Sequence, residues 1–208
     1  MSSERKSHWE KIYHGKATNE MSWYQPKPIT SIRIIEDLKV AKSARIIDVG
    51  GGDSLLVDHL LDLGYTNITV LDISEKAIQS AKNRLGTRAN NVHWIEADVA
   101  SFTPHHQYDF WHDRAAFHFL IDIEEIDFYV STVSSAISVG GFLVIGTFSL
   151  GGPKKCSGLE IQQYSSQSMF EVFKSNFDRI TCTTVEHITP VGSTQEFVFC
   201  SFQRNDLA

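Results

Sequence analysis

Three consecutive glycines are the first residues of this sequence whose type and spacing could form a binding site. Gly50, Gly51 and Gly52 follow the apolar run ARIIDV and precede a stretch with helical periodicity. A glycine turn between a strand and a helix lets the backbone approach a ligand closely and directs helix N–H groups at it. The loop lacks the Lys-Ser/Thr pair of a triphosphate-binding loop. It matches the dinucleotide pattern G-x-G-x-x-G only in part, because Leu55 stands at the third glycine.

Three aspartates end successive apolar runs, and the position of each predicts a different ligand group. Asp48 stands just before the glycines, where a carboxylate suits a cationic amine and would repel a pyrophosphate. Asp72 ends the next run, where a carboxylate can accept hydrogen bonds from both ribose hydroxyls. Asp98 ends the third run and could accept from the exocyclic amine of an adenine, with the Val99 backbone beside it. An amino acid joined to adenosine matches all three, although each aspartate could instead cap a turn, a helix or a loop.

The elements that position these residues alternate between strand and helix over most of the chain. Short apolar runs predict strands, and segments with helical periodicity predict helices between them. The predicted strands are residues 44–49, 67–73, 91–99, 107–113 and 140–149. The predicted helices are residues 54–65, 74–86 and 124–137. This alternation predicts parallel strands with helices on both faces, whose carboxyl ends share the edge at which open α/β sheets bind ligands.

Both ends of the chain depart from this alternation. Residues 177–204 form two β-rich runs around PVGST with no helix between them, which predicts a hairpin. Residues 1–43 contain Trp9 and Trp23 in an aromatic, Pro-containing segment that we expect to stack on the ligand as a lid, although simple packing on the sheet is the alternative. We therefore expect one domain over residues 1–208, with residues 1–43 as a cap and residues 44–208 as the ligand-binding α/β core.

Composition narrows the function classes. The net charge of -6 argues against a nucleic-acid-binding protein, which would need a basic surface. No apolar run is long enough to span a membrane, and the N-terminus has no apolar segment typical of a secretory signal. The three widely spaced cysteines predict free thiols in a reducing compartment, so we expect a cytoplasmic protein. Histidines without cysteines at metal-binding spacing predict no metal site.

With these segments in place, the sequence resembles the class I S-adenosylmethionine-dependent methyltransferases. The matching pieces are IIDVGGGDS, VLDIS, IEADV, YDFWHDRAAFHFL, GGFLVIGTF and the terminal hairpin, over residues 44–203. The resemblance implies a Rossmann-like, mostly parallel seven-stranded sheet with a C-terminal antiparallel hairpin, and S-adenosylmethionine as the cofactor. It places the methionine moiety beside Asp48 and the glycines, the ribose at Asp72, and the adenine at Asp98 and Val99. The full set of predicted cofactor-binding residues is Trp9, Trp23, Asp48, Gly50, Gly51, Gly52, Asp72, Ile73, Asp98, Val99 and Asp113.

Two narrower resemblances imply different methyl acceptors. DRAA after the fourth strand, GTFSLGGP after the fifth and WEKIY…WYQ near the start are similar to thiopurine methyltransferases. In that group an Asp-Arg pair ends the fourth strand and an aromatic lid covers the cofactor. The segment DVGGGDSLLVDHLLDLGYTNITVLDIS is similar to the elongation-factor lysine methyltransferases.

Asp113 and Arg114 are the candidate catalytic residues. Arg114 could steady an anionic acceptor or the cofactor, or the two side chains could form a structural ion pair. His112 precedes them, and we interpret it as a packing residue more readily than as a base. We predict a methyltransferase that acts on a small molecule with a soft nucleophile such as a thiol. A protein lysine methyltransferase and a non-catalytic cofactor-binding subunit are the alternatives, and an NAD-dependent oxidoreductase is disfavoured by Asp48 and the incomplete glycine pattern.

Overall fold

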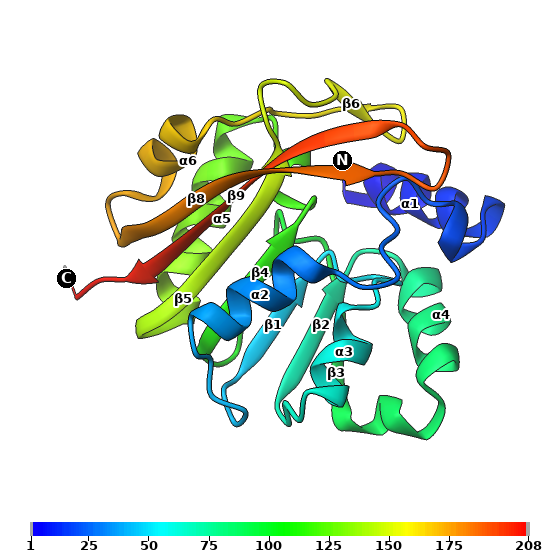
Figure 1. The fold of residues 1–208 in the computed structure, drawn as a ribbon, viewed down its shortest axis with the longest axis horizontal. Coiled ribbons are helices and arrows are strands. Elements are labelled where there is room, and N and C mark those ends of the chain that lie inside the picture. The colour runs from blue at the N-terminus through cyan, green and yellow to red at the C-terminus, as the bar shows by residue number, and fades with distance from the viewer. Residues whose placement is uncertain (1, 207–208) are drawn as a thin grey trace.

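A single mixed sheet of seven strands organises the chain, in the order β3-β2-β1-β4-β5-β9-β8 (Figure 1). The computed structural model describes residues 2–206. Strands β1 to β5 run parallel, and β9 is antiparallel to both of its neighbours. The seven strands are β1 (Ile46–Val49), β2 (Ile68–Asp72), β3 (Val92–Glu96), β4 (Tyr108–Arg114), β5 (Ile137–Phe148), β8 (Phe177–Ile188) and β9 (Thr194–Arg204). The predicted fold, including the C-terminal antiparallel hairpin, is confirmed.

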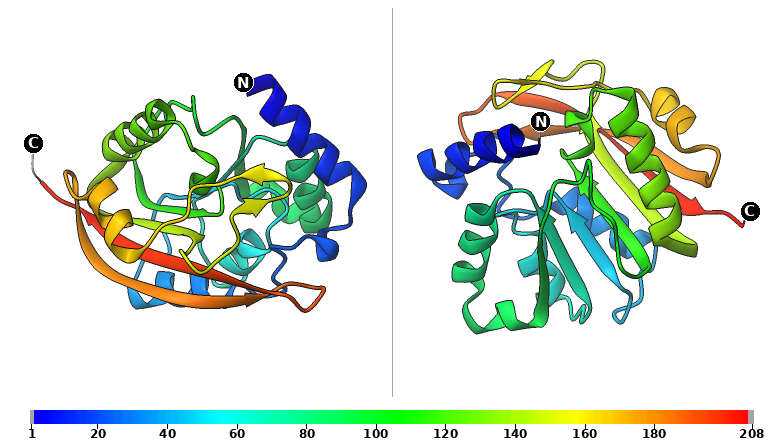
Figure 2. Two further views of the ribbon diagram at one scale, coloured as in Figure 1. Left: turned by 90° about the horizontal axis from the view of Figure 1, so that it is seen from above. Right: turned by 180° about the vertical axis from the view of Figure 1, so that it is seen from behind.

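Helices cover both faces of the sheet, as Figure 2 shows from two further directions. The helices are α1 (Ser2–Gly15), α2 (Ile29–Asp37), α3 (Leu56–Asp62), α4 (Glu75–Leu85), α5 (Ile123–Ala136) and α6 (Ser166–Phe173). Three short 3-10 segments, η1 (Thr18–Glu20), η2 (Gly86–Asn91) and η3 (Phe117–Phe119), and a small ribbon of β6 (Lys155–Cys156) and β7 (Leu159–Glu160) complete the described elements. Side chains of α5 and α6 belong to one apolar core, and side chains of α2 and α3 to a second.

The strands differ in how many of their residues are buried, according to their place in the sheet. Every residue of β1 and β2 is buried, as expected for central parallel strands covered on both faces. In the edge strand β3 only Val92 is buried, and His93 and Glu96 are exposed. The predicted helix after β2 is also confirmed: it begins where the Ser74 hydroxyl accepts a 3.1 Å hydrogen bond from Ala77 N, and it ends at Gly86 with a φ of 59°.

The cysteines correct one of our expectations. Cys182 and Cys200 form a disulfide between β8 and β9, whereas we predicted three free thiols. The two residues are register partners in the hairpin, and a separation of 18 residues in sequence becomes 4.1 Å between their Cα atoms. Cys156 is a free and buried thiol. Among the helices over residues 2–206, none is long and apolar enough to cross a membrane.

Candidate functional site

A cavity lies at the carboxyl ends of β1 to β4, and the N-terminal segment covers it. The strand ends and the glycine loop form its floor, while α1 and the residues after η1 form its other side, which Figure 1 shows above the ends of β1 and β2. Most of the predicted cofactor-binding residues line this cavity, namely Trp9, Trp23, Asp48, Gly50, Gly51, Asp72, Ile73, Asp98 and Val99, and so does the candidate catalytic residue Arg114. The structure therefore brings the predicted site together, although Gly52 and Asp113 do not line it.

The glycine loop fits closely between two of the carboxylates. Gly50 and Gly52 have φ values of 65° and 41°, a conformation that residues with a side chain rarely adopt. A Cβ atom on Gly51 would lie 2.6 Å from Asp48 Oδ2, and one on Gly52 would lie 2.7 Å from Asp72 Oδ2. The glycines thus serve the site by letting the backbone pass beside both aspartates. That role includes Gly52, which the cavity does not reach.

Asp48 is held in place by a chain of buried hydrogen bonds. Its Oδ1 lies 2.7 Å from His112 Nδ1, and the other ring nitrogen of His112 lies 2.9 Å from the Ser31 hydroxyl. Asp48 and His112 are register partners on β1 and β4, and Ser31 comes from α2. All three side chains are buried. The arrangement fixes one carboxylate oxygen and leaves the Oδ2 atom beside Gly51, where a cationic amine would find an acceptor.

Asp72 is a buried carboxylate without a cationic partner among residues 2–206. Its Oδ1 accepts a 2.8 Å hydrogen bond from Ser74 N. Burial raises the pKa of Asp72 to about 7, and the negative charge of Asp48 adds to the shift. A carboxylate in this position is stabilised by a ligand that donates hydrogen bonds to it. The two hydroxyls of a ribose fit this requirement, so the residues present are suited to an adenosine cofactor.

Asp98 is already paired within the protein. Both of its oxygens lie 3.1 Å from Arg5 Nη1, and its Oδ1 also accepts from Ala100 N. The second amino group of Arg5 contacts the carboxylate of Glu125 at 2.7 and 2.8 Å. Arg5 therefore joins α1 to the loop after β3 and to α5. Sequence reasoning missed Arg5 and Glu125, because 93 and 120 residues separate the two pairs.

Asp113 does not line the cavity, and both of its carboxylate oxygens are bonded within the protein; its assignment as a cofactor-binding residue and catalytic candidate stays a prediction. Its Oδ1 accepts hydrogen bonds from Ala116 N and Phe117 N, both at 3.0 Å, and its Oδ2 accepts from the Tyr129 hydroxyl at 2.8 Å. The side chain is fully buried, and burial raises its pKa to about 6. These contacts hold the turn after β4, in which Ala115 has a φ of 67°. Within residues 2–206 Asp113 forms no ion pair with the neighbouring arginine.

Arg114 extends from the end of β4 into the cavity. Its Nη1 donates a 3.1 Å hydrogen bond to the carbonyl of Trp23, and its guanidinium lies 4.8 Å from the centre of the Phe197 ring. Burial lowers its pKa to about 10, so it stays cationic at neutral pH. Cys156 lies nearby, and burial raises the pKa of its thiol to about 11. Arg114 is thus a cation next to a neutral thiol.

The aromatic residues of the N-terminal segment pack against one another over the cavity. The Trp9 ring lies 5.9 Å from Trp23 and 5.0 Å from Phe119, in edge-to-face geometry. Tyr13 lies 6.1 Å from Trp23, and its hydroxyl reaches the neighbourhood of Gly52. These contacts join aromatic side chains of the protein itself. Stacking of Trp9 or Trp23 on a cofactor stays a prediction.

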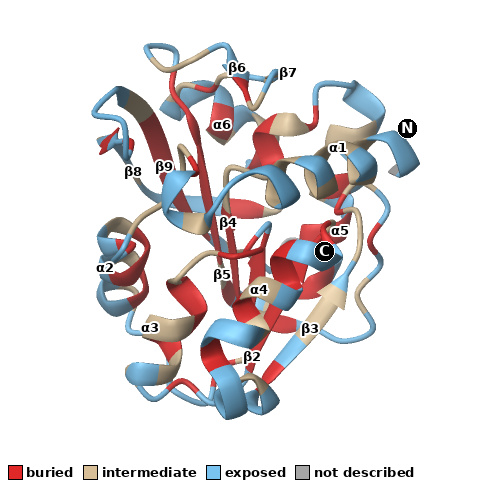
Figure 3. Cartoon of the chain, turned by 90° about the vertical axis from the view of Figure 1, so that its right-hand side faces the viewer, coloured by how far each residue is buried: buried red, intermediate tan, exposed pale blue. Residues whose placement is uncertain are grey.

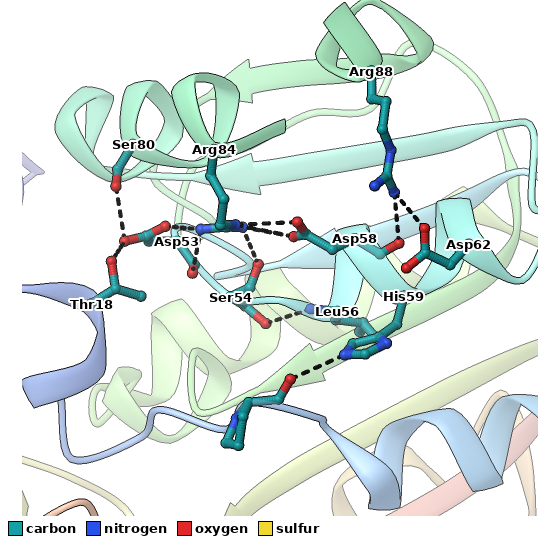
Figure 4. A network of polar contacts seen from close by, with 11 residues as sticks. Thr18, Asp53, Ser54, Leu56, Asp58, His59, Asp62, Ser80, Arg84 and Arg88 are labelled. Carbon is teal, nitrogen blue, oxygen red and sulfur yellow. Dashed lines mark hydrogen bonds and ion pairs between the residues drawn. The ribbon is translucent and has the colours of Figure 1, made fainter. Parts of the chain in front are cut away.

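A polar network behind the glycine loop fixes its position (Figure 4). Asp53 is buried and accepts hydrogen bonds from the side chains of Thr18, Ser80 and Arg84. Arg84 also contacts the carboxylate of Asp58 at 2.9 Å. The network joins the loop after β1 to η1, α3 and α4. Sequence reasoning missed this network, because its members come from four separate segments.

Comparisons with known proteins agree with this geometry. A model of the methyltransferase domain family matches residues 47–143. The mouse eEF1A lysine and N-terminal methyltransferase is 25% identical over 143 residues, which are 64% of this chain and 20% of that protein. The chain therefore spans about one fifth of that curated relative.

Two solved structures share the fold. The N-methyltransferase NodS from Bradyrhizobium japonicum, in complex with S-adenosyl-L-homocysteine, superposes with a TM-score of 0.71 at 13% identity, covering 94% of this chain and 97% of that one. The 1,6-didemethyltoxoflavin-N1-methyltransferase from Burkholderia thailandensis, with 1,6-didemethyltoxoflavin and S-adenosylhomocysteine bound, superposes with a TM-score of 0.72 at 14% identity. The match covers 99% of this chain and 87% of that one. Neither structure nor the mouse relative is a thiopurine methyltransferase, so that resemblance stays a prediction.

Proposed function

We propose that this chain, a class I S-adenosylmethionine-dependent methyltransferase by its fold and domain match, methylates a small molecule through a soft nucleophile such as a thiol. The observation that carries the proposal is the cavity at the sheet edge. Asp48, Asp72 and Asp98 end or follow three neighbouring strands there, and Arg114 ends the fourth. The three acids match the amine, the ribose and the adenine of the cofactor. Arg114 lines the same cavity beyond the three acids, and we assign it to the acceptor.

The residues of the cavity act by binding and orientation. When bound, the cofactor supplies a methyl group that its sulfonium already activates for in-line displacement. Asp48 would accept a hydrogen bond from the amine, and Asp72 would accept hydrogen bonds from the ribose. Trp9 and Trp23, which line the cavity, would help to exclude water from it. Holding two reactants in line can contribute about 7–11 kcal/mol in favourable systems, so a dedicated base is optional for a thiol that ionises readily.

The charge of the cavity favours a small acceptor over a protein lysine. A lysine ammonium must lose its proton before it can accept a methyl group, and a nearby acid or an apolar slot assists that loss. Arg114 instead presents a buried positive charge, which repels an approaching ammonium. The match to the mouse eEF1A lysine and N-terminal methyltransferase is the specific observation that keeps a protein lysine acceptor as the second candidate.

Incubation with methyl-labelled cofactor separates these candidates. The purified chain is offered a panel of small thiols in one series and total lysate protein in the other. We expect label in the small-molecule fraction. Label confined to protein bands would overturn the small-molecule proposal. Tight binding of the cofactor without turnover in either series, restored by a second protein, would instead identify a cofactor-binding subunit.

A further inference from the structure

One atom of Arg114 has no hydrogen-bond partner. Its Nη1 is used by the Trp23 carbonyl, but Nη2 is buried and contacts no acceptor. Within residues 2–206 no carboxylate forms an ion pair with this guanidinium. The carboxylate of Asp48 interacts electrostatically with it, but that side chain is already bonded to His112. A buried cation with an unused donor is costly unless something binds to it.

Apart from Asp48, the titratable groups that interact with Arg114 carry no negative charge. Burial raises the pKa of the Cys156 thiol to about 11, so no thiolate forms there at neutral pH. Burial and the charge of Arg114 together lower the pKa of His118 to about 3 and also lower that of His187. Both histidines are therefore neutral. The side of the cavity around Arg114 is positive, in contrast to the side formed by the three aspartates.

We infer that Nη2 of Arg114 binds an anionic group on the methyl acceptor, such as a carboxylate. This inference rests on the proposed methyltransferase function. The strand order places Arg114, at the end of β4, next to Asp48 on β1 and farther from Asp72 on β2 and from Asp98 after β3. The guanidinium lies over the Phe197 ring of β9, and β9 lies on the side of β4 opposite to β2 and β3. The acceptor, and not the adenosine end of the cofactor, meets Arg114.

Matched pairs of small thiols test the inference. The probes are mercaptoacetate, 3-mercaptopropionate and 4-mercaptobenzoate, each compared with its neutral amide. Binding to the complex with S-adenosylhomocysteine is measured by calorimetry, and methyl transfer is measured with S-adenosylmethionine. We expect at least one carboxylate to bind about 10- to 100-fold more tightly than its amide, the effect of one hydrogen bond between charged groups. Arg114→Gln abolishes this preference. Arg88→Gln, which removes an exposed arginine paired with Asp62, keeps it.

Each outcome has a distinct meaning. Equal binding of acids and amides, or no binding of any probe, overturns the anionic acceptor. If Arg114→Gln weakens binding of S-adenosylhomocysteine and leaves the preference among thiols unchanged, the partner of Nη2 is the cofactor's own carboxylate and the inference is wrong. Binding that depends on the carboxylate but is not followed by methyl transfer would support the anion site at Arg114 and would overturn the proposed function.

Thermal unfolding supplies a second readout. If Arg114 exists for ligand binding, Arg114→Gln removes an uncompensated charge and keeps a donor for the Trp23 carbonyl, so the melting temperature stays the same or rises. A purely structural arginine predicts the opposite, because its loss would lower the melting temperature. A clear drop in the ligand-free variant would therefore contradict the inference, whatever the binding measurements give.

Discussion

At the residue scale, the most informative side chain is the carboxylate of Asp72. It is buried, has one hydrogen bond to Ser74 N, and has no cation beside it among residues 2–206. Asp72→Ala should weaken binding of S-adenosylhomocysteine by about 1–3 kcal/mol, the cost of losing hydrogen bonds to a charged group. Calorimetry measures this directly. Unchanged affinity in a variant with a normal unfolding transition would contradict the assignment of the ribose to Asp72.

The raised pKa of Asp72 also predicts a pH dependence. An aspartate has an ordinary pKa of 3.8, and in the folded chain that of Asp72 is about 7. Between these values the folded protein holds a proton that the unfolded chain has lost, so the stability of the ligand-free protein falls as pH rises through this window. The pKa of Asp113, raised to about 6, acts in the same direction.

Cofactor binding should depend on pH in the opposite sense. Ribose hydroxyls donate to the ionised carboxylate, so affinity should rise with pH up to about 7 and binding below that pH should release a proton. Calorimetry at about pH 6 in buffers of different ionisation enthalpy measures the released proton. Asp72→Asn should abolish the release, whereas retention of the full release in that variant would exclude Asp72 as its source.

The local sequence was enough to predict the site residues that are defined by their place at the end of a strand. The glycines and the aspartates at strand ends follow from spacing, because the carboxyl ends of parallel strands share one edge. Their partners were not predictable in this way. Ser31 reaches His112 from α2, and Arg5 reaches Asp98 from α1, so each pair forms only after distant segments pack together. The satisfied hydrogen bonds of Asp113 were hidden for the same reason.

At the element scale, α1 is held differently from the other helices. None of residues 3–15 is fully buried, as the pale blue and tan helix in Figure 3 shows. Its contacts with the core include the ion pairs of Arg5 with Asp98 and Glu125 and of Lys6 with Glu96. A helix with few buried apolar contacts opens locally at low cost. This explains how a ligand reaches a cavity that α1 covers.

Arg5→Gln should therefore loosen α1 without unfolding the sheet. We expect faster amide hydrogen exchange over residues 3–15, while exchange in β1 and β4 stays unchanged. Binding of S-adenosylhomocysteine should slow exchange in α1 of the unaltered chain. Lys174→Gln, which removes an exposed ion pair with Glu171 at the end of α6, is the control. Equal exchange of α1 in both variants would show that Arg5 does not hold this helix.

The β8–β9 hairpin carries a second prediction at this scale. The Cys182–Cys200 disulfide closes a loop of 18 residues, which in the chain-entropy account stabilises the fold by about 3 kcal/mol. The double variant Cys182→Ser with Cys200→Ser should lose about this much free energy of unfolding in urea. A reducing agent should lower the stability of the unaltered chain and leave the double variant unaffected. Equal stability of the two proteins without reducing agent would argue against the bond.

At the scale of the whole molecule, the order of the strands in the sheet brings charged residues from four separate strand ends together in one cavity. The order β3-β2-β1-β4 lines up Asp98, Asp72, Asp48 and Arg114 along one edge, with the acids first and the cation last. The alternation of strands and helices predicted this edge. The aromatic residues of the segment 1–43 predicted a cap over it. The pairing of the hairpin cysteines was not predicted, because it depends on how the end of the chain packs on the finished sheet.

The binding of S-adenosylhomocysteine tests the central claim most directly. The claim is that three acids at the edge of this sheet hold an adenosine joined to an amino acid. Calorimetry on the purified chain should show one site for S-adenosylhomocysteine, weakened by Asp72→Ala, and no comparable binding of NAD. Binding of NAD together with no response to S-adenosylhomocysteine would contradict the account.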